Sequence, residues 1–387
     1  MPWETVSLMD ARKQLVALVQ SGAWTMKAAC QHFGVSRKTG HKWLSRFEEE
    51  GRAGLSDKSR APHSSPQAWP DETKELVLSL KRKRPHWGPK KLVAVLAKKG
   101  FETPSPSTAG EWLREANLVR PTRRPAPRAT PSHLTEATRP NQLWCYDFKG
   151  HFRLRNGRYC YPLTVTDDYS RMLLGCFALT TTSIDATRPC MEQLFREYGL
   201  PDALRSDNGE PFASVGLAGL NTLNVSWLKQ GIRLERTRPA SPQENARHER
   251  MHRTLKAETT RPPGRAVAEQ QRRFDDWRID FNTERPHEAL DMDVPSNWYQ
   301  RSAKLFREGP ITTTYPGHFE VRHVRNRGHI KMAGRDVYLS EALIGEHVGL
   351  NEVDDGIWQV HFISEAICGI DLRGDKPKLI AASQLGT

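Results

Sequence analysis

The sequence predicts a multidomain protein: an all-α first third, an α/β core with a mixed sheet, and a small all-β barrel or sandwich at the end. Three observations predict this order. Apolar residues recur at helical spacing up to about residue 116. Strand-like runs then alternate with helices from residue 141, and short strands follow one another from about residue 311.

The first helical module is expected over residues 1–60. Within it, Met26–Leu44 fits two helices broken at Gly34, with Ser36 as the N-cap of the second helix. This spacing is typical of a helix-turn-helix domain, whose second helix presents side chains to the major groove of DNA, here Arg37, Lys38, His41 and Lys42. Gly40 departs from the template, because an apolar residue usually stands there. A small helical bundle with a solvated basic face is the alternative.

A second module of the same type is expected over residues 71–118, after a Pro/Ser-rich linker. Residues 119–139 then predict an extended basic, Pro-rich linker, in which Arg123 and Arg124 would contact DNA phosphates. The chain has a net charge of +13, which suits a polyanionic partner or serves solubility alone. The clustering of the basic residues favours the polyanion.

The core is expected over residues 140–305, with the order β-β-β-α-β-α-β-α. We expect strands at 143–150, 159–166, 171–180, 203–206 and 232–237, and helices at 183–198 and from about residue 243. Residues 311–387 are expected to form the all-β barrel, which serves either DNA contact or dimerisation.

Three carboxylates stand out in the core. Asp147 lies in an otherwise uncharged strand, where a carboxylate is costly unless it is paired, hydrogen-bonded or bound to a cation. Asp207 directly follows a strand, which is a turn signal but also a place where α/β folds put catalytic groups. Glu249 shares a helix face with Asn245, Arg253 and Lys256, either as a solvated acid or as a metal ligand facing DNA.

In this order, the carboxylates and the sequence segments around them resemble the DDE core shared by bacterial insertion-sequence transposases and retroviral integrases. These segments are Asn141–Lys149, Thr166–Arg171, Arg205–Gly209, Pro242–Arg253 and Phe281–Leu290. The resemblance covers roughly residues 141–300, and the paired helical modules fit the same family. It implies a ribonuclease-H-like core in which Asp147, Asp207 and Glu249 are the catalytic residues and the metal ligands.

The resemblance also implies a reaction and its partners. Such an enzyme binds the double-stranded ends of its mobile element, frees 3′-hydroxyls by hydrolysis and joins them to target DNA. Two Mg²⁺ (or Mn²⁺) ions per active site hold the attacking and leaving oxygens. We expect a homodimer or a higher homo-oligomer on DNA, with Asn245, Arg253 and Lys256 contacting the nucleic acid.

Two departures from the family pattern concern the third ligand. The gap between Asp207 and Glu249 holds 41 residues, longer than usual, and Ala246 stands where glycine is common. Glu244 and Glu210 are the alternative ligands.

A competing motif overlaps the same helix. His248-Glu-Arg-Met-His252 matches the H-E-x-x-H pattern of zinc peptidases, with Glu249 as the general base. The basic neighbours would repel zinc, so we interpret His248 and His252 as polar neighbours of DNA. A non-catalytic helix-turn-helix regulator is the third hypothesis, but it leaves the three carboxylates without a role.

The cysteines and the hydropathy bear on the compartment. Six cysteines without a C-x-x-C pair predict reduced, mostly buried thiols. Neither a secretory signal at the start nor an apolar run of roughly 20 residues is present, so we expect a cytoplasmic, nucleoid-associated protein without a membrane partner.

Overall fold

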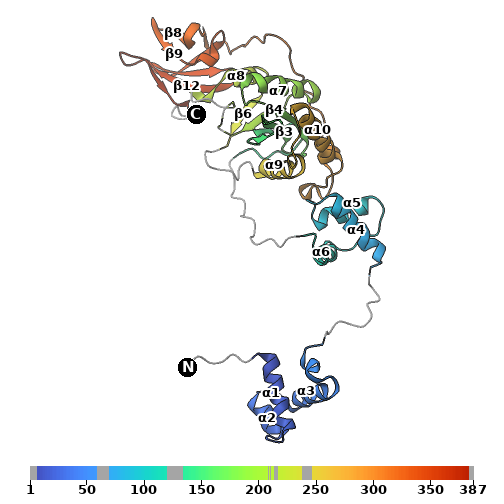
Figure 1. Ribbon diagram of the computed structural model, residues 1–387. Coiled ribbons are helices and arrows are strands. Elements are labelled where there is room, and N and C mark those ends of the chain that lie inside the picture. The colour runs from blue at the N-terminus through green and yellow to red at the C-terminus, as the bar shows by residue number, and fades with distance from the viewer. Residues whose placement is uncertain are drawn as a thin grey trace. The chain divides into compact units, whose positions relative to one another are not determined.

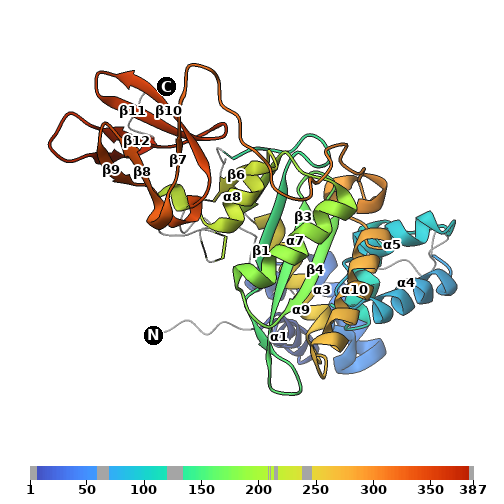
Figure 2. The same cartoon turned by 90° about the horizontal axis from the view of Figure 1, so that it is seen from above.

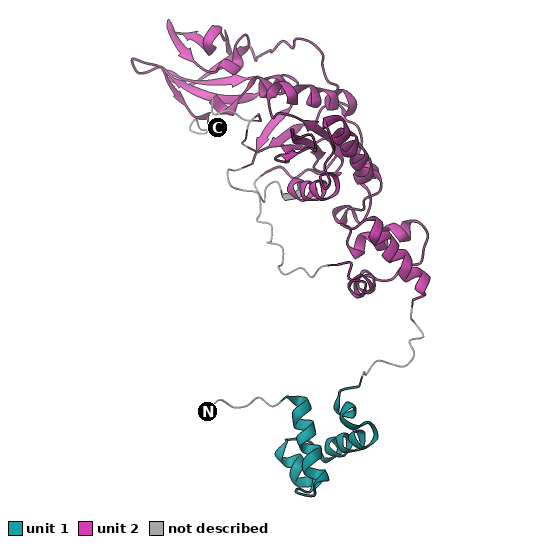
Figure 3. Cartoon of the chain, viewed as in Figure 1, with its two compact units in different colours: residues 1–68 teal, residues 69–387 magenta. Residues whose placement is uncertain are grey.

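The structure is a computed structural model that describes residues 7–58, 69–119, 134–207, 209, 211–212, 217–237 and 246–382, with only the backbone of 246 and 247. The chain divides into two compact units, residues 1–68 and 69–387 (Figure 3). No helix among the described residues is both long and apolar enough to cross a membrane.

The first unit is a bundle of three α-helices that ends in a 3-10 helix (Figure 1): α1 (Leu8–Gln20), α2 (Met26–His32), α3 (Arg37–Glu50) and η1 (Gly51–Leu55). Each α-helix begins after a hydroxyl residue that accepts a backbone hydrogen bond, as Ser36 does from the amide of Thr39 at 3.2 Å. The N-cap and the break at Gly34 are confirmed. Apolar side chains from all three helices close the core, among them Leu15, Val16, Ala29, Trp43 and Leu55.

Gly40 lies where α3 approaches α2. A Cβ atom at this position would lie 2.4 Å from Sγ of Cys30 and 2.7 Å from Sδ of Met26. The side chains of Cys30 and Met26 therefore fill the space that a side chain at position 40 would need. This close approach gives the physical reason for the departure from the helix-turn-helix template at Gly40.

The second unit begins with three more helices: α4 (Asp71–Lys83), α5 (Pro89–Lys98) and α6 (Pro106–Glu115). They surround a separate apolar cluster that includes Val77, Leu92 and Leu113. Ion pairs connect them to the following core, namely Arg84 with Asp280, Lys90 with Glu288, and Lys98 with Asp293. The Lys90–Glu288 and Lys98–Asp293 pairs are more exposed than the partly buried Arg84–Asp280 pair, so those two contribute little stability.

The core holds a six-stranded mixed sheet made of β1 (Trp144–Phe148), β2 (Phe152–Arg153), β3 (Tyr159–Asp167), β4 (Leu173–Leu179), β5 (Ala203–Ser206) and β6 (Arg233–Arg236). β3 pairs antiparallel with β1 and β4, whereas β5 runs parallel to β1 and β6. The main order is β4-β3-β1-β5-β6, with β2 on the edge of β3. The expected mixed sheet and ribonuclease-H-like core are confirmed.

Helices cover both faces of this sheet (Figure 2): α7 (Ile184–Tyr198) and α8 (Thr222–Lys229) on one side, α9 (Ala246–Thr259) and α10 (Val267–Thr283) on the other. Side chains of β1 alternate between the faces. Trp144 and Tyr146 pack with α7 and α8, whereas Asp147 turns toward α9. This alternation places the carboxylate beneath the α9 helix.

The C-terminal region is all-β, as expected. Its strands are β7 (Glu320–His323), β8 (His329–Met332), β9 (Arg335–Tyr338), β10 (His347–Asp354), β11 (Ile357–Phe362), β12 (Glu365–Asp371) and β13 (Lys378–Ile380). Five of them form an antiparallel sheet in the order β13-β12-β11-β10-β7, and β8 pairs with β9. Short 3-10 helices lie at Leu217–Gly219, Glu288–Leu290, Pro295–Asn297, Asn326–Gly328 and Glu341–Leu343.

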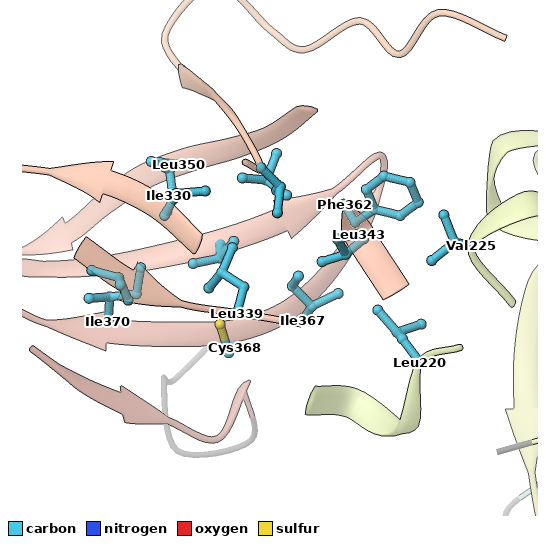
Figure 4. Packing of buried hydrophobic residues seen from close by; sticks show 14 of the residues in the cluster. Leu220, Val225, Ile330, Leu339, Leu343, Leu350, Phe362, Ile367, Cys368 and Ile370 are labelled. Carbon is cyan, nitrogen blue, oxygen red and sulfur yellow. The ribbon is translucent and has the colours of Figure 1, made fainter. Parts of the chain in front are cut away.

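One apolar cluster joins this region to the core (Figure 4). Leu220 and Val225, which precede β6, pack in the same cluster as Leu343, Phe362 and Ile367. Removing such side chains from water is the main stabilising contribution. The C-terminal sheet and the α8 side of the core therefore share one hydrophobic interior.

Candidate catalytic and metal centre

The pairing of β1 with β5 brings the two aspartates together. The parallel register aligns Trp144 with Leu204 and Cys145 with Arg205. Continued by two residues, it sets Asp147 beside Asp207 at the carboxyl ends of both strands. Asp207 itself is exposed, and its Oδ1 accepts a hydrogen bond of 3.0 Å from the amide of Gly209. This short turn holds the second carboxylate at the strand end.

Glu249 approaches from the first turn of α9. The next residue toward the N-terminus, His248, is hydrogen-bonded to Thr164 of β3, and Thr164 is the direct β-sheet partner of Asp147. The glutamate is exposed, as are Arg250, Arg253 and Lys256 on the same helix. The acid thus lies at the edge of the aspartate pair, on a basic and solvent-accessible surface.

Electrostatics also connects the three carboxylates. Burial, together with the negative charges of Asp207 and Glu249, raises the pKa of Asp147 to about 7, against the opposing effects of the Phe148 backbone hydrogen bond and Lys149. The side chain of Asp147 is only 19% exposed. A largely buried carboxylate between two other acids is unfavourable in the absence of a cation.

The donor set fits a hard divalent metal ion. Carboxylate oxygens are the ligands that Mg²⁺ and Mn²⁺ prefer, and a cation would relieve the repulsion that acts on Asp147. Asp147, Asp207 and Glu249 are the residues that would hold it. Glu210 and Glu244, the alternative third ligands, lie outside the described residues.

The two histidines of α9 do not face DNA, and this corrects the interpretation from the sequence. His248 and His252 are each 2% exposed and pack against β3. Burial lowers the pKa of His248 to about 3 and holds that of His252 well below its ordinary value, so both imidazoles are neutral. Met251 and Leu255 of α9 are also buried.

Two threonines of β3 bind these histidines. The hydroxyl of Thr164 lies 2.7 Å from Nε2 of His248 and 2.6 Å from Nε2 of His252. Thr166 lies 2.9 Å from Nδ1 of His248, and Nδ1 of His252 lies 3.8 Å from Oδ2 of Asp147. Thr164 and Thr166 were not predicted from the sequence. The available signal was their spacing at alternate strand positions, together with two histidines one helical turn apart.

This hydrogen bonding bears on the zinc alternative. Ligand atoms of Asp147, His248 and His252 lie within 4.8 Å of one another, a spacing that a metal ion can bridge. However, both Nε2 atoms are directed at one hydroxyl group, which occupies the space where a shared zinc ion would have to bind. A tetrahedral zinc site needs those lone pairs free.

The other expected DNA contacts are only partly described. Arg37, Lys38, His41 and Lys42 are exposed on the N-terminal half of α3, and Arg253 and Lys256 are exposed on α9. Asn245, Arg123 and Arg124 lie outside the described residues.

Family models match most parts of the chain. Residues 11–63 match a helix-turn-helix domain and residues 39–113 a homeodomain-like domain. Residues 137–242 and 230–295 match integrase core domains. Residues 319–378 match the C-terminal domain of IS481 family transposases.

Individual relatives agree with these matches. The insertion element IS407 uncharacterized 31.7 kDa protein of Burkholderia multivorans is 27% identical over 244 residues, covering 60% of this chain and 83% of that protein. The Gag-Pol polyprotein of Koala retrovirus is 27% identical over 197 residues, or 50% of this chain but only 11% of the polyprotein. The simian T-cell lymphotropic virus intasome in complex with PP2A regulatory subunit B56 gamma is a distant structural match, with a TM-score of 0.38, 14% identity, and coverage of 79% of this chain and 96% of that one.

Helix-turn-helix domains, an integrase core and an IS481-type C-terminal domain thus follow one another along this chain. By these matches the chain is similar to insertion-sequence transposases with an integrase core, and its C-terminal region is similar to that of the IS481 family.

Proposed function

We propose that this protein is a DNA transposase that cuts at the ends of its mobile element and joins the freed 3′-hydroxyls to target DNA. The observation that carries the proposal is that the charges of two other carboxylates, Asp207 and Glu249, act on the largely buried Asp147. The β1–β5 register sets Asp147 beside Asp207, and the charge of Glu249 acts on Asp147 from α9. The matches to integrase core domains and to the IS481-type C-terminal domain support the same activity.

The chemistry requires an in-line displacement at a phosphodiester. Divalent ions held by Asp147, Asp207 and Glu249, two per active site, would stabilise the charge on the phosphate and on the attacking and leaving oxygens. The protein itself supplies rigid placement of the ligands. Asp147 is fixed by the sheet and Asp207 by its turn, while α9 carries Glu249 beside the cationic side chains of Arg250 and Arg253.

DNA would be held by separate basic surfaces. Four exposed residues of α3 would enter the major groove, as in other helix-turn-helix domains: Arg37, Lys38, His41 and Lys42. Arg253 and Lys256 would hold phosphates beside the active site, together with Asn245, Arg123 and Arg124. We propose that the active form is a homodimer or a higher homo-oligomer on double-stranded DNA.

Substitution of the aspartates tests the proposal. Asp147→Asn and Asp207→Asn should each abolish end cleavage and strand joining on oligonucleotides while leaving DNA binding intact, because metal coordination is lost. The control is Asp185→Asn, an exposed acid in the first turn of α7. Cleavage that survives either active-site change at the level of the control would contradict the proposal. Wild-type protein that binds DNA without cleaving it, as a purely regulatory protein would, would also contradict it.

A second experiment separates this proposal from a zinc peptidase, which the spacing of Asp147, His248 and His252 favours together with the H-E-x-x-H motif. Elemental analysis of the purified protein should find no stoichiometric zinc. His252→Ala should also reduce DNA cleavage far less than Glu249→Gln does. One tightly bound zinc ion per chain would overturn the transposase interpretation of α9.

A further inference from the structure

The interior between α9 and β3 contains a polar cluster that the reaction does not use directly. It consists of Thr164, Thr166, His248 and His252, and all four side chains are buried. Burying a polar group is costly unless its hydrogen bonds are made. Apolar residues would fill this space at a lower free-energy cost. The presence of polar residues therefore suggests a role for the cluster, which the direction of its hydrogen bonds can reveal.

The protons in this cluster can be counted. Each neutral imidazole carries one N–H, and the Thr164 hydroxyl carries one proton. That hydroxyl lies between Nε2 of His248 and Nε2 of His252, so it can donate to only one of them, and the other must donate to it. The backbone carbonyl of Asp147, at 3.2 Å, is a third and longer contact of the same hydroxyl.

Only one arrangement suits an ionised Asp147. If Thr164 donates to His248 or to the carbonyl, His252 carries its proton on Nε2, and the lone pair of Nδ1 faces the carboxylate at 3.8 Å. If Thr164 donates to Nε2 of His252, the Nδ1–H of that ring faces the carboxylate instead. His248 then donates through Nε2–H and accepts from Thr166 at Nδ1.

We propose that Thr166, His248, Thr164 and His252 form a directional hydrogen-bond chain that positions Asp147 as an ionised metal ligand. The four are positioning residues, since all four side chains are buried beneath α9. The contact of 3.8 Å is longer than a hydrogen bond, so its effect on the carboxylate is electrostatic. Polar partners behind metal ligands orient them in this way in many metal sites.

The inference rests on the proposed function, and metal binding without DNA tests it on the full chain. The probe is Mn²⁺, measured by the loss of the free-ion signal in electron paramagnetic resonance. Thr164→Val keeps the side-chain shape and removes the hydroxyl, and should raise the Mn²⁺ dissociation constant about tenfold or more. Thr164→Ser keeps the hydroxyl and should retain near wild-type affinity.

A matched control separates positioning from general destabilisation. Thr187 in α7 is equally buried, and its hydroxyl donates to the carbonyl of Ser183 at 2.9 Å. Thr187→Val should destabilise the fold in a thermal melt without changing Mn²⁺ affinity. If Thr164→Val behaves like Thr187→Val, the chain is only structural and the inference fails.

The tautomers supply a spectroscopic test. Long-range ¹H–¹⁵N correlation spectra of histidine-labelled protein should show His248 protonated at Nε2 and His252 protonated at Nδ1. His248→Gln and His252→Gln assign the signals. Finding Nε2–H on both rings would reverse the last step of the chain and overturn the inference.

The metal centre and the hydrogen-bond chain can fail separately. Asp147→Asn should abolish Mn²⁺ binding if the carboxylates form the metal centre. If it leaves binding unchanged, the proposed function fails. If it abolishes binding while Thr164→Val has no effect, the metal centre stands and only the hydrogen-bond chain is rejected.

Discussion

Helices α3 and α9 are both rich in basic residues, yet they bury very different side chains. α3 buries Gly40 and Trp43 and leaves its charged residues exposed, apart from the half-buried Arg46. α9 buries Met251 and Leu255 together with His248 and His252. The difference lies in what each helix packs against. α3 packs on apolar side chains of α1 and α2, whereas α9 packs on a strand that presents two threonine hydroxyls.

The two helices show when a polar residue on a helix can be assigned to the surface. On α3 the assignment holds because the surface beneath the helix is apolar and leaves an inward polar group without compensation. On α9 the same assignment fails, since the β3 hydroxyls satisfy the imidazoles and remove the cost of burying them. An amphipathic pattern therefore identifies the buried face of a helix only when the surface that packs against the helix is known.

The largest expected effect comes from a matched pair of glutamates on the two helices. Glu249→Gln should lower the cleavage rate by about a thousandfold or more, because a metal ligand is removed where charge stabilisation dominates. Glu49→Gln on α3 removes an exposed acid of the same type and should leave the rate unchanged. Activity that survives Glu249→Gln but not Glu244→Gln or Glu210→Gln would move the third ligand away from α9.

A second expected effect follows from the raised pKa of Asp147. Its carboxyl must lose a proton to bind a metal, so Mn²⁺ affinity should rise about tenfold per pH unit up to the pKa of about 7, and then level off. Calorimetric titrations across this range measure it. A flat profile would show that Asp147 is already ionised in the metal-free protein at lower pH.

The same pKa shift has a consequence for stability with the opposite sign. Between the ordinary pKa of 3.8 and the raised value of about 7, the folded chain binds a proton that the unfolded chain has released. The free energy of unfolding of the metal-free protein should therefore fall as pH rises through this window. Denaturation of Asp147→Asn beside the wild type isolates this contribution, which the variant should lack.

A smaller effect distinguishes the two basic surfaces in DNA binding. Arg37→Ala and Lys38→Ala on α3 should remove the preference for element-end DNA over random DNA, with a cost of about 1–3 kcal/mol for each base that the side chain reads. Arg253→Ala and Lys256→Ala on α9 should weaken binding to both DNAs equally. They should also reduce the slope of log affinity against log salt concentration by about 0.9 for each phosphate contact that is lost. Gel-shift titrations at several salt concentrations check this. An equal decrease in affinity for both DNAs from the α3 changes would place end recognition elsewhere.

The smallest effect concerns the close approach of α2 and α3. Gly40→Leu restores the apolar residue of the helix-turn-helix template, yet it should destabilise residues 1–68 by about 1–3 kcal/mol, because the space is already filled by Cys30 and Met26. Urea denaturation of this fragment, which has its own core, measures the change. A stabilised variant would mean that the two helices separate readily.

The sequence by itself determined the elements and their order. Periodicity and caps located α3, strand composition located β3 and β5, and the words around Asp147 indicated an integrase core. These signals are local, so they can be read without the fold. The roles of Asp147, Asp207 and Glu249 remain predictions.

Only the tertiary structure decided which residues meet. The parallel register of β1 and β5 sets Asp147 beside Asp207, although 59 residues lie between them in the sequence. The burial of His248 and His252 depended on hydroxyls from β3, more than 80 residues away. A buried polar side chain is stable only where its partner is present, and that partner comes from a distant segment of the chain.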